Sequence, residues 1–171
     1  MSIRATVLLL AALSMSASTS NSLAQAAETT RPSATVSTET FASQTAEVNG
    51  ATLHYVRAGQ GEPLLLIKGF PQDWSEFRPI IPRLAQQFTV VAVDLPGIGR
   101  SSPPSGGYEA ANLAAQIHAL ANALKLDRPY VVGHDLGAHV TYAYVRRFPE
   151  SLRGAIRSNG VLRRNLPLER K

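Results

Sequence analysis

The pattern of apolar and polar positions becomes regular near residue 45. From there TAEVNGATLHYVRAG, residues 45–59, alternates apolar and polar side chains on both sides of Asn49-Gly50. This alternation is typical of a half-buried strand, and Asn-Gly favours a two-residue turn in which both residues have positive φ. The stretch therefore predicts an antiparallel hairpin.

Three later stretches are almost continuously apolar, namely PLLLI at 63–67, FTVVAVD at 88–94 and PYVVG at 129–133. Short apolar runs of this kind are typical of strands that are buried on both faces of a sheet. We therefore predict three buried strands.

Amphipathic segments separate and follow these strands. Apolar residues recur at spacings of three and four in 74–88, which two prolines interrupt, in 109–126, and in 136–148, which ends before a proline. This spacing predicts helices with one apolar face.

The order of these elements predicts an α/β fold, because alternating strands and helices form a mostly parallel sheet with helices on both faces. The next buried parallel strand should come from LRGAIRSNG at 152–160. Arg157 lies inside this stretch, and burying an unpaired guanidinium is costly, so we expect the strand to be short. We expect four parallel strands at most and three helices.

Ligands of such sheets bind at the carboxyl ends of the strands. Gly69, Asp94 and Asp135 each follow a predicted strand closely, so this edge of the sheet is the expected site. The alternative interpretation is that tight turns simply require glycine and aspartate.

The first residues have the composition of an export signal. Arg4 precedes the apolar run ATVLLLAALSMSA, and LAQA at 23–26 supplies the small residues expected before a cleavage point. We predict a signal peptide over residues 1–26 and a secreted or periplasmic protein with no stable membrane span after cleavage, the alternative being a membrane-anchoring helix.

Residues 27–44 are rich in Thr, Ser and Ala and predict a flexible linker, which leaves 45–171 as a partial domain. The 171-residue chain contains no cysteine, so disulfides and thiol chemistry are excluded. Its net charge of +5 comes from a cluster of basic residues in the last nineteen positions: Arg153, Arg157, Arg163, Arg164, Arg170 and Lys171. Because the rest carries charges of mixed sign and no nucleic-acid motif, we expect no nucleic-acid partner.

The stretch VVGHDLGAHV at 131–140 places Asp135 between a predicted strand and a predicted helix. A residue on such a turn is presented at the edge of the sheet, and the glycines around it allow strand and helix to approach closely. Asp135 is therefore a candidate nucleophile. The alternative is that it only caps the helix.

Three motifs occur in a characteristic order: KGFPQDW at 68–74, DLPGIGRSSPP at 94–104 and GHDLGA at 133–138. Together they resemble the α/β-hydrolase superfamily over about residues 46–155. The aspartate-nucleophile branch, which holds epoxide hydrolases and haloalkane and fluoroacetate dehalogenases, fits best.

The resemblance implies that Asp135 is the nucleophile, that the backbone N–H groups of Phe70 and Leu136 form the oxyanion hole, and that Trp74 lines the substrate pocket. The other interpretation of Trp74 is an ordinary core residue. Lys68 departs from the family, which normally has histidine there, so the shape of the oxyanion loop is an open question.

A carboxylate nucleophile indicates attack on a saturated carbon, because the resulting ester can be hydrolysed whereas a serine ether cannot. Among such reactions, the resemblance favours epoxide hydrolysis. At the positions of Leu136 and Phe70, dehalogenases carry residues that hold halide or a substrate carboxylate, and neither Leu136 nor Phe70 can do so. Haloalkane or fluoroacetate dehalogenation is therefore the less favoured alternative. An esterase would need serine on the turn.

The family also needs an acid and a histidine after the nucleophile. His139 is the only later histidine, and we expect it to face the packing layer. His54 and His118 precede the nucleophile and are expected to be surface or packing residues, and the resemblance further implies lid tyrosines that protonate the ring oxygen of the epoxide. Tyr142 and Tyr144 lie on the nucleophile's helix and cannot replace these lid tyrosines.

The tail after Ile156 favours the interpretation that the chain is truncated or frame-shifted over the alternative of a genuine basic binding tail. We therefore expect a hydrolase of the epoxide-hydrolase type that is incomplete in this chain, or a non-catalytic exported fragment. We expect a small-molecule substrate and neither cofactor nor metal, and the oligomeric state stays open.

Overall fold

The computed structural model describes residues 41–160. The predicted signal peptide, most of the predicted linker, and tail residues 161–171 lie outside the described residues. The first strand begins at Ser43, inside the last two positions of the predicted linker.

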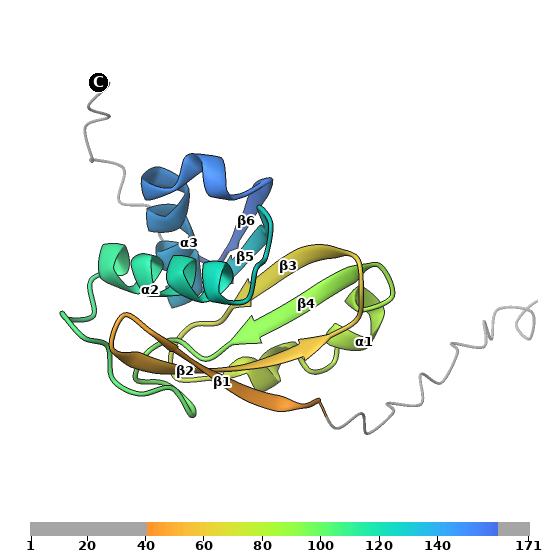
Figure 1. The fold of residues 1–171 in the computed structure, drawn as a ribbon, viewed down its shortest axis with the longest axis horizontal. Helices are drawn as coiled ribbons and strands as arrows, with labels where there is room; N and C mark the ends of the chain where they lie inside the picture. Colours follow the sequence, from red (N-terminus) through yellow and green to blue (C-terminus); the bar gives the residue numbers. More distant parts are fainter. Residues whose placement is uncertain (1–40, 161–171) are drawn as a thin grey trace, which may run out of the picture. The chain divides into compact units, whose positions relative to one another are not determined.

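The described residues form a six-stranded sheet in the order β1-β2-β4-β3-β5-β6 (Figure 1). Strands β3, β4, β5 and β6 run parallel to their neighbours within this group, whereas β1 and β2, and β2 and β4, are antiparallel. This confirms the α/β class and the four parallel strands. The strands are β1 Ser43–Val48, β2 Ala51–Ala58, β3 Glu62–Ile67, β4 Phe88–Val93, β5 Tyr130–His134 and β6 Gly154–Ser158.

The hairpin between β1 and β2 turns at the predicted dipeptide. Asn49 has φ +48° and Gly50 has φ +75°, as a two-residue turn between twisted antiparallel strands requires. Val48 and Ala51 are paired directly across it.

Helices cover both faces of the sheet. Helix α2 (Ala110–Ala123) and helix α3 (Leu136–Arg147) pack with the larger core cluster, whereas the short α1 (Ile81–Leu84) packs with the smaller one. None of the helices in residues 41–160 is long and apolar enough to cross a membrane.

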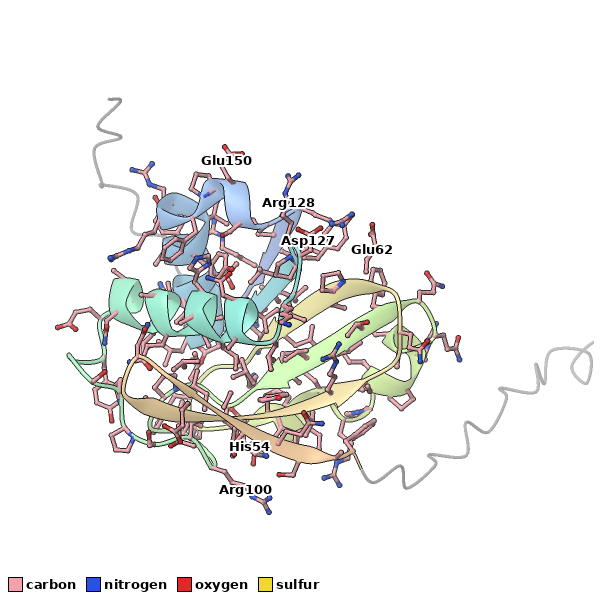
Figure 2. The ribbon with its side chains drawn as sticks, viewed as in Figure 1. His54, Glu62, Arg100, Asp127, Arg128 and Glu150 are labelled. Atoms are coloured by element: carbon pink, nitrogen blue, oxygen red, sulfur yellow. The ribbon has the colours of Figure 1, made fainter. Side chains whose placement is uncertain are left out.

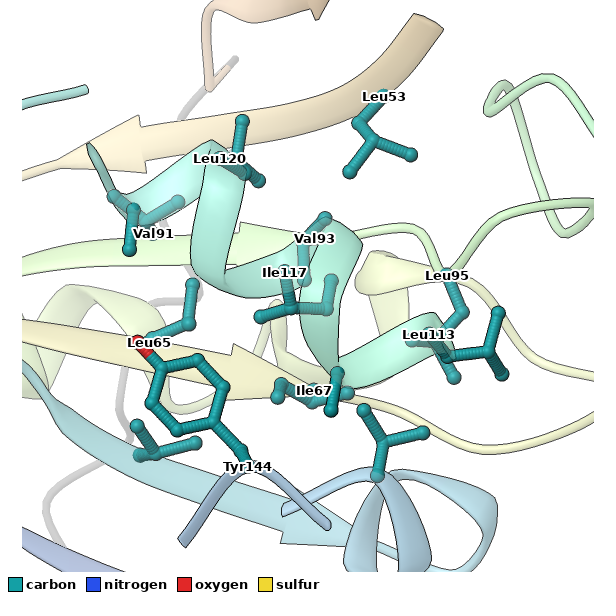
Figure 3. Packing of buried hydrophobic residues seen from close by; sticks show 14 of the residues in the cluster. Leu53, Leu65, Ile67, Val91, Val93, Leu95, Leu113, Ile117, Leu120 and Tyr144 are labelled. Atoms are coloured by element: carbon teal, nitrogen blue, oxygen red, sulfur yellow. The ribbon is translucent and has the colours of Figure 1, made fainter. Parts of the chain in front are cut away.

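The two clusters follow the alternation of side chains along β3 and β4. Leu65 and Val91 point to the face covered by α2 and α3, whereas Leu66 and Val90 point to the opposite face. Figure 3 shows the larger cluster, in which side chains from the sheet interlock with those of the two helices.

Two sequence expectations need correction. The predicted helix over 74–88 is two short pieces, a 3-10 helix η1 (Trp74–Phe77) and α1, because Pro79 and Pro82 cannot donate the backbone hydrogen bonds of a continuous helix.

Strand β6 was expected to be buried, yet most of its residues are exposed and Ile156 retains 64% of its accessible surface. Within residues 41–160, no strand pairs with its outer edge. Arg157 therefore needs no buried partner, and its guanidinium lies 5.0 Å from the ring centre of Tyr142.

Candidate active site

Asp135 lies on a strained turn between β5 and α3. Its φ of +52° and ψ of −117° are costly for a residue with a side chain. Its backbone N–H donates to the carbonyl oxygen of Ser158 at 3.0 Å. Its carboxylate makes no capping hydrogen bond to α3, so within the described residues the helix-cap interpretation finds no support.

Helix α3 lies very close to both β3 and β5 beside this turn. A Cβ on Gly137 would lie 2.7 Å from the carbonyl carbon of Ile67, and one on Gly133 would collide with the side-chain oxygen of Thr141. Only glycine fits at these positions, so the glycines hold Asp135 at the edge of the sheet.

The Gly-Phe-Pro loop contacts this turn directly. A Cβ on Gly69 would lie 2.7 Å from both the Cβ of Asp135 and the backbone nitrogen of Leu136. The backbone N–H groups of Phe70 and Leu136 have no hydrogen-bond acceptor among residues 41–160. Two free donors are therefore available on the segments that flank the carboxylate, as an oxyanion hole requires.

An open, largely polar cavity of about 620 Å³ adjoins Asp135. Phe70 and Asp135 line it, and Phe70 is 70% exposed. Trp74 does not line this cavity; its ring packs edge-on against Phe41, with 5.9 Å between the ring centres. The complete lining is Lys68, Phe70, Gln72, Ser75, Glu76, His134, Asp135 and Asn159.

Three charged or titratable residues in this cavity form a cluster that the sequence analysis did not assemble. The ammonium of Lys68 contacts Nδ1 of His134 and a carboxylate oxygen of Glu76. The other Glu76 oxygen lies 3.6 Å from the same imidazole nitrogen. The available signals were the unusual Lys68 before Gly-Phe-Pro and the position of His134 directly before the predicted nucleophile.

Lys68 is nearly inaccessible, with 4% of its surface exposed. Burial lowers the pKa of its ammonium, and the nearby carboxylate of Asp135 partly opposes this shift. A protonated lysine can only donate, so Nδ1 of His134 then accepts and the ring proton is on Nε2. In this state His134 is a hydrogen-bond donor rather than a base.

Asp94, the third residue expected at this edge, lies beneath the loops instead of in the cavity lining. It is 1% exposed and accepts hydrogen bonds from the backbone N–H groups of Trp74 at 2.8 Å and Arg100 at 3.1 Å, and from Nδ1 of His54 at 2.7 Å. These bonds tie two loops to the sheet. Asp94 therefore supports the site without touching its cavity.

The remaining predicted histidines and tyrosines lie away from this cavity. His139 is exposed, so the expectation that it faces the packing layer was wrong. His118 is a packing residue, stacked on Phe148 at 3.9 Å between ring centres. Tyr144 is completely buried in the larger core. Within residues 41–160, no three His, Cys, Asp or Glu side chains gather as potential metal ligands.

The sheet order, the strained turn and the adjoining Gly-Phe-Pro loop agree with a comparison of the sequence with protein families. The alpha/beta hydrolase fold family matches residues 62–169. The chain belongs to the α/β-hydrolase family. The fold predicted from the sequence is thereby confirmed, and the relatives that follow confirm the resemblance to epoxide hydrolases and dehalogenases.

Relatives of this α/β-hydrolase include epoxide hydrolases and dehalogenases. A soluble epoxide hydrolase of Corynebacterium sp. is 44% identical over 99 residues, which cover 58% of this chain and 35% of that protein. A fluoroacetate dehalogenase of Burkholderia sp. is 34% identical over 119 residues, covering 67% of this chain and 39% of that protein.

Solved structures give the same picture. The ligand-free epoxide hydrolase CorEH has a TM-score of 0.68 at 34% identity, over 75% of this chain and 47% of that one. An epoxide hydrolase from Vigna radiata has a TM-score of 0.65 at 31% identity, over 68% and 39%. This α/β-hydrolase chain thus spans less than half the length of each of these four relatives.

Proposed function

We propose that Asp135 attacks the ring carbon of an epoxide. One carboxylate oxygen forms a bond to that carbon, the ring C–O bond breaks, and the electron pair leaves on the ring oxygen, which must then be protonated. The observation that carries this proposal is the uncapped carboxylate on a strained turn in a polar cavity. A carboxylate attacks the carbon directly and needs no separate base for this step.

The similarity to epoxide hydrolases supports an epoxide as the substrate. The cavity also contains donors that can protonate the opened ring, because the ammonium of Lys68 and the Nε2–H of His134 belong to its lining. The free N–H groups of Phe70 and Leu136 suit the oxyanion that forms when water attacks the ester.

The second step needs a base to deprotonate that water. His134 is the histidine of the cavity lining, and the contact with Lys68 occupies the Nδ1 lone pair that a base would use. We therefore expect the alkyl ester on Asp135 to form and then to persist in this chain.

The test is intact mass spectrometry of the full chain after incubation with a small reactive epoxide such as styrene oxide. The expected result is one adduct, located on Asp135 by peptide mapping and lost in Asp135→Asn. Asp127→Asn, which changes an exposed carboxylate with 84% side-chain exposure, should keep the adduct. Repeated turnover to diol without any adduct would contradict the expectation that the ester persists. Equal labelling of Asp127 would contradict the proposal that Asp135 is the nucleophile.

A second candidate is displacement of halide from a halocarboxylate, favoured by the buried Lys68 ammonium in the Asp135 cavity. Because Glu76 and His134 already contact that ammonium, we place this reaction second. Incubation with fluoroacetate distinguishes the two, since one fluoride per chain and a glycolate ester on Asp135 would indicate dehalogenation.

We also propose export, on the basis of the basic start, the apolar run and the small residues at 23–26. Expression in a bacterial host followed by mass analysis of the mature N-terminus tests it. A chain beginning at Ala27 in the periplasm or medium is expected, and an uncleaved cytoplasmic chain would contradict export.

A further inference from the structure

A second arrangement of nucleophilic type lies outside the Asp135 cavity, on the hairpin. The hydroxyl oxygen of Ser43 lies 2.6 Å from Nε2 of His54, and Nδ1 of the same ring lies 2.7 Å from a carboxylate oxygen of Asp94. The three residues come from β1, from β2 and from the residue directly after β4. Serine, imidazole and carboxylate are thus joined in the order in which a serine nucleophile is activated.

The hydrogen bonds of Asp94 fix which atoms donate and which accept between Ser43, His54 and Asp94. Asp94 also accepts from the backbone N–H groups of Trp74 and Arg100, so both of its carboxylate oxygens act as hydrogen-bond acceptors. The nitrogen of His54 that faces it must then carry the ring proton. Nε2 consequently has a free lone pair and accepts the hydroxyl proton of Ser43.

The imidazole is held rigidly while the hydroxyl is accessible. His54 and Asp94 are each 1% exposed, and the backbone N–H of His54 donates to the side chain of Ser101 at 2.9 Å. Ser43, by contrast, lies at an exposed position of β1. A reagent from solvent can therefore reach the oxygen without entering the core.

Arg100 supplies positive charge at this position. Its Nη1 donates to the hydroxyl oxygen of Ser43 at 3.0 Å. Figure 2 labels His54, on strand β2 of the hairpin, and Arg100 near it in this view; both side chains contact the hydroxyl of Ser43. An oxyanion that develops on a group bound to Ser43 would lie near this guanidinium.

We propose that Ser43 is a second nucleophile, activated by His54 and Asp94, which takes acyl or phosphonyl groups from activated donors. With an ester, Oγ bonds to the carbonyl carbon as its proton moves to Nε2 of His54. The ester C–O bond then breaks, and the departing alkoxide takes that proton. The product is an ester on Ser43, chemically distinct from the alkyl ester on Asp135.

The experiment uses an alkyl fluorophosphonate, from which Ser43 displaces fluoride. The full chain is incubated with the reagent, the adduct is located by peptide mass spectrometry, and the rate at each serine is measured. Ser105 is the matched control, because it is also exposed but donates to the backbone carbonyl of Asn49 at 2.6 Å instead of to an imidazole. A positioned base contributes about 10² or more in rate, so Ser43 should react about 100-fold faster than Ser105.

Two variants separate activation from simple exposure. His54→Asn keeps an N–H donor for Asp94 but removes the base, and should lower labelling of Ser43 about 100-fold. Arg100→Gln should lower it several-fold while leaving Ser105 unchanged. Thermal melting of each variant shows whether it is folded.

The wild-type comparison decides the proposal even if a variant does not fold. Labelling of Ser43 no faster than that of Ser105 would mean that the Ser43–His54–Asp94 chain only anchors β1, and would overturn the proposal. Since an epoxide reports on Asp135 and the fluorophosphonate on Ser43, each site can fail without the other.

Discussion

The substitution Asp94→Asn tests how the loops around the site are held. In the wild-type protein one carboxylate oxygen accepts from Trp74 N–H, and the other accepts from His54 Nδ1–H and Arg100 N–H. An asparagine has a single oxygen. In its best orientation this oxygen still accepts from His54 and Arg100, and the amide NH₂ group then faces the N–H of Trp74.

The expected cost follows from this count. One hydrogen bond to a charged acceptor is lost, which is worth about 1.5–3 kcal/mol, and a largely buried N–H is left without an acceptor. The two remaining bonds weaken because the acceptor is now neutral. We expect a total loss of about 2–4 kcal/mol in the free energy of unfolding, or about 10 °C in melting temperature for a domain of this size.

Urea unfolding followed by circular dichroism measures the loss as a shift in midpoint at constant slope. Asp127→Asn is the matched control: its carboxylate is exposed and lies 3.7 Å from a guanidinium nitrogen of Arg153, so its removal should leave the midpoint unchanged. An Asp94→Asn protein as stable as the wild type would refute the reasoning, because it would show that the three bonds do not hold the loops.

Three further substitutions probe the turn, the core and the half-buried His118. Gly133→Ala should lower the free energy of unfolding by about 3 kcal/mol, because its methyl group would collide with α3. The control Gly154→Ala, whose methyl group would lie 3.5 Å from the ring of Tyr130, should be nearly neutral. The urea unfolding midpoints of the two variants make the comparison. Ile117→Ala should cost about 2–5 kcal/mol in the same assay because its side chain is fully buried, and a similar loss in exposed Ile156→Ala would contradict this. Burial lowers the pKa of His118 below 6.5, so the unfolded chain binds more protons as the pH falls through that range and stability decreases in acid. His118→Gln should make the urea midpoint depend less on pH between pH 7.5 and 5.5. An unchanged dependence on pH would show that His118 does not cause the loss of stability in acid.

The elements of the described fold were largely predictable from local sequence. Alternation around Asn49-Gly50 predicted the hairpin, and continuous apolar runs predicted β3, β4 and β5, because these patterns record which sides of a strand are buried. Strand β6 was instead predicted from its place in the order of elements, and the expectation that it is buried was wrong. Local sequence cannot tell whether a neighbouring strand covers an edge, and in the described part of the chain none covers β6.

The candidate site was predictable in part. Asp135 and its glycines were recognisable because a tight strand-to-helix turn imposes local requirements on φ and on space. Trp74 was assigned to the pocket by resemblance, yet its ring packs against Phe41. The direction in which a side chain leaves a short 3-10 helix depends on packing that the sequence does not encode locally.

By itself, the sequence determined the hairpin, strands β3 to β5, helices α2 and α3, and the turn that presents Asp135, since each depends on residues within a few positions of one another. Only the tertiary structure brought Lys68 to His134, 66 positions later, and Ser43 to the imidazole of His54 and the carboxylate of Asp94. Contacts between segments far apart in the chain depend on the register and order of the whole sheet, and hydrophobic periodicity carries no information about which polar side chains that order places within hydrogen-bonding distance.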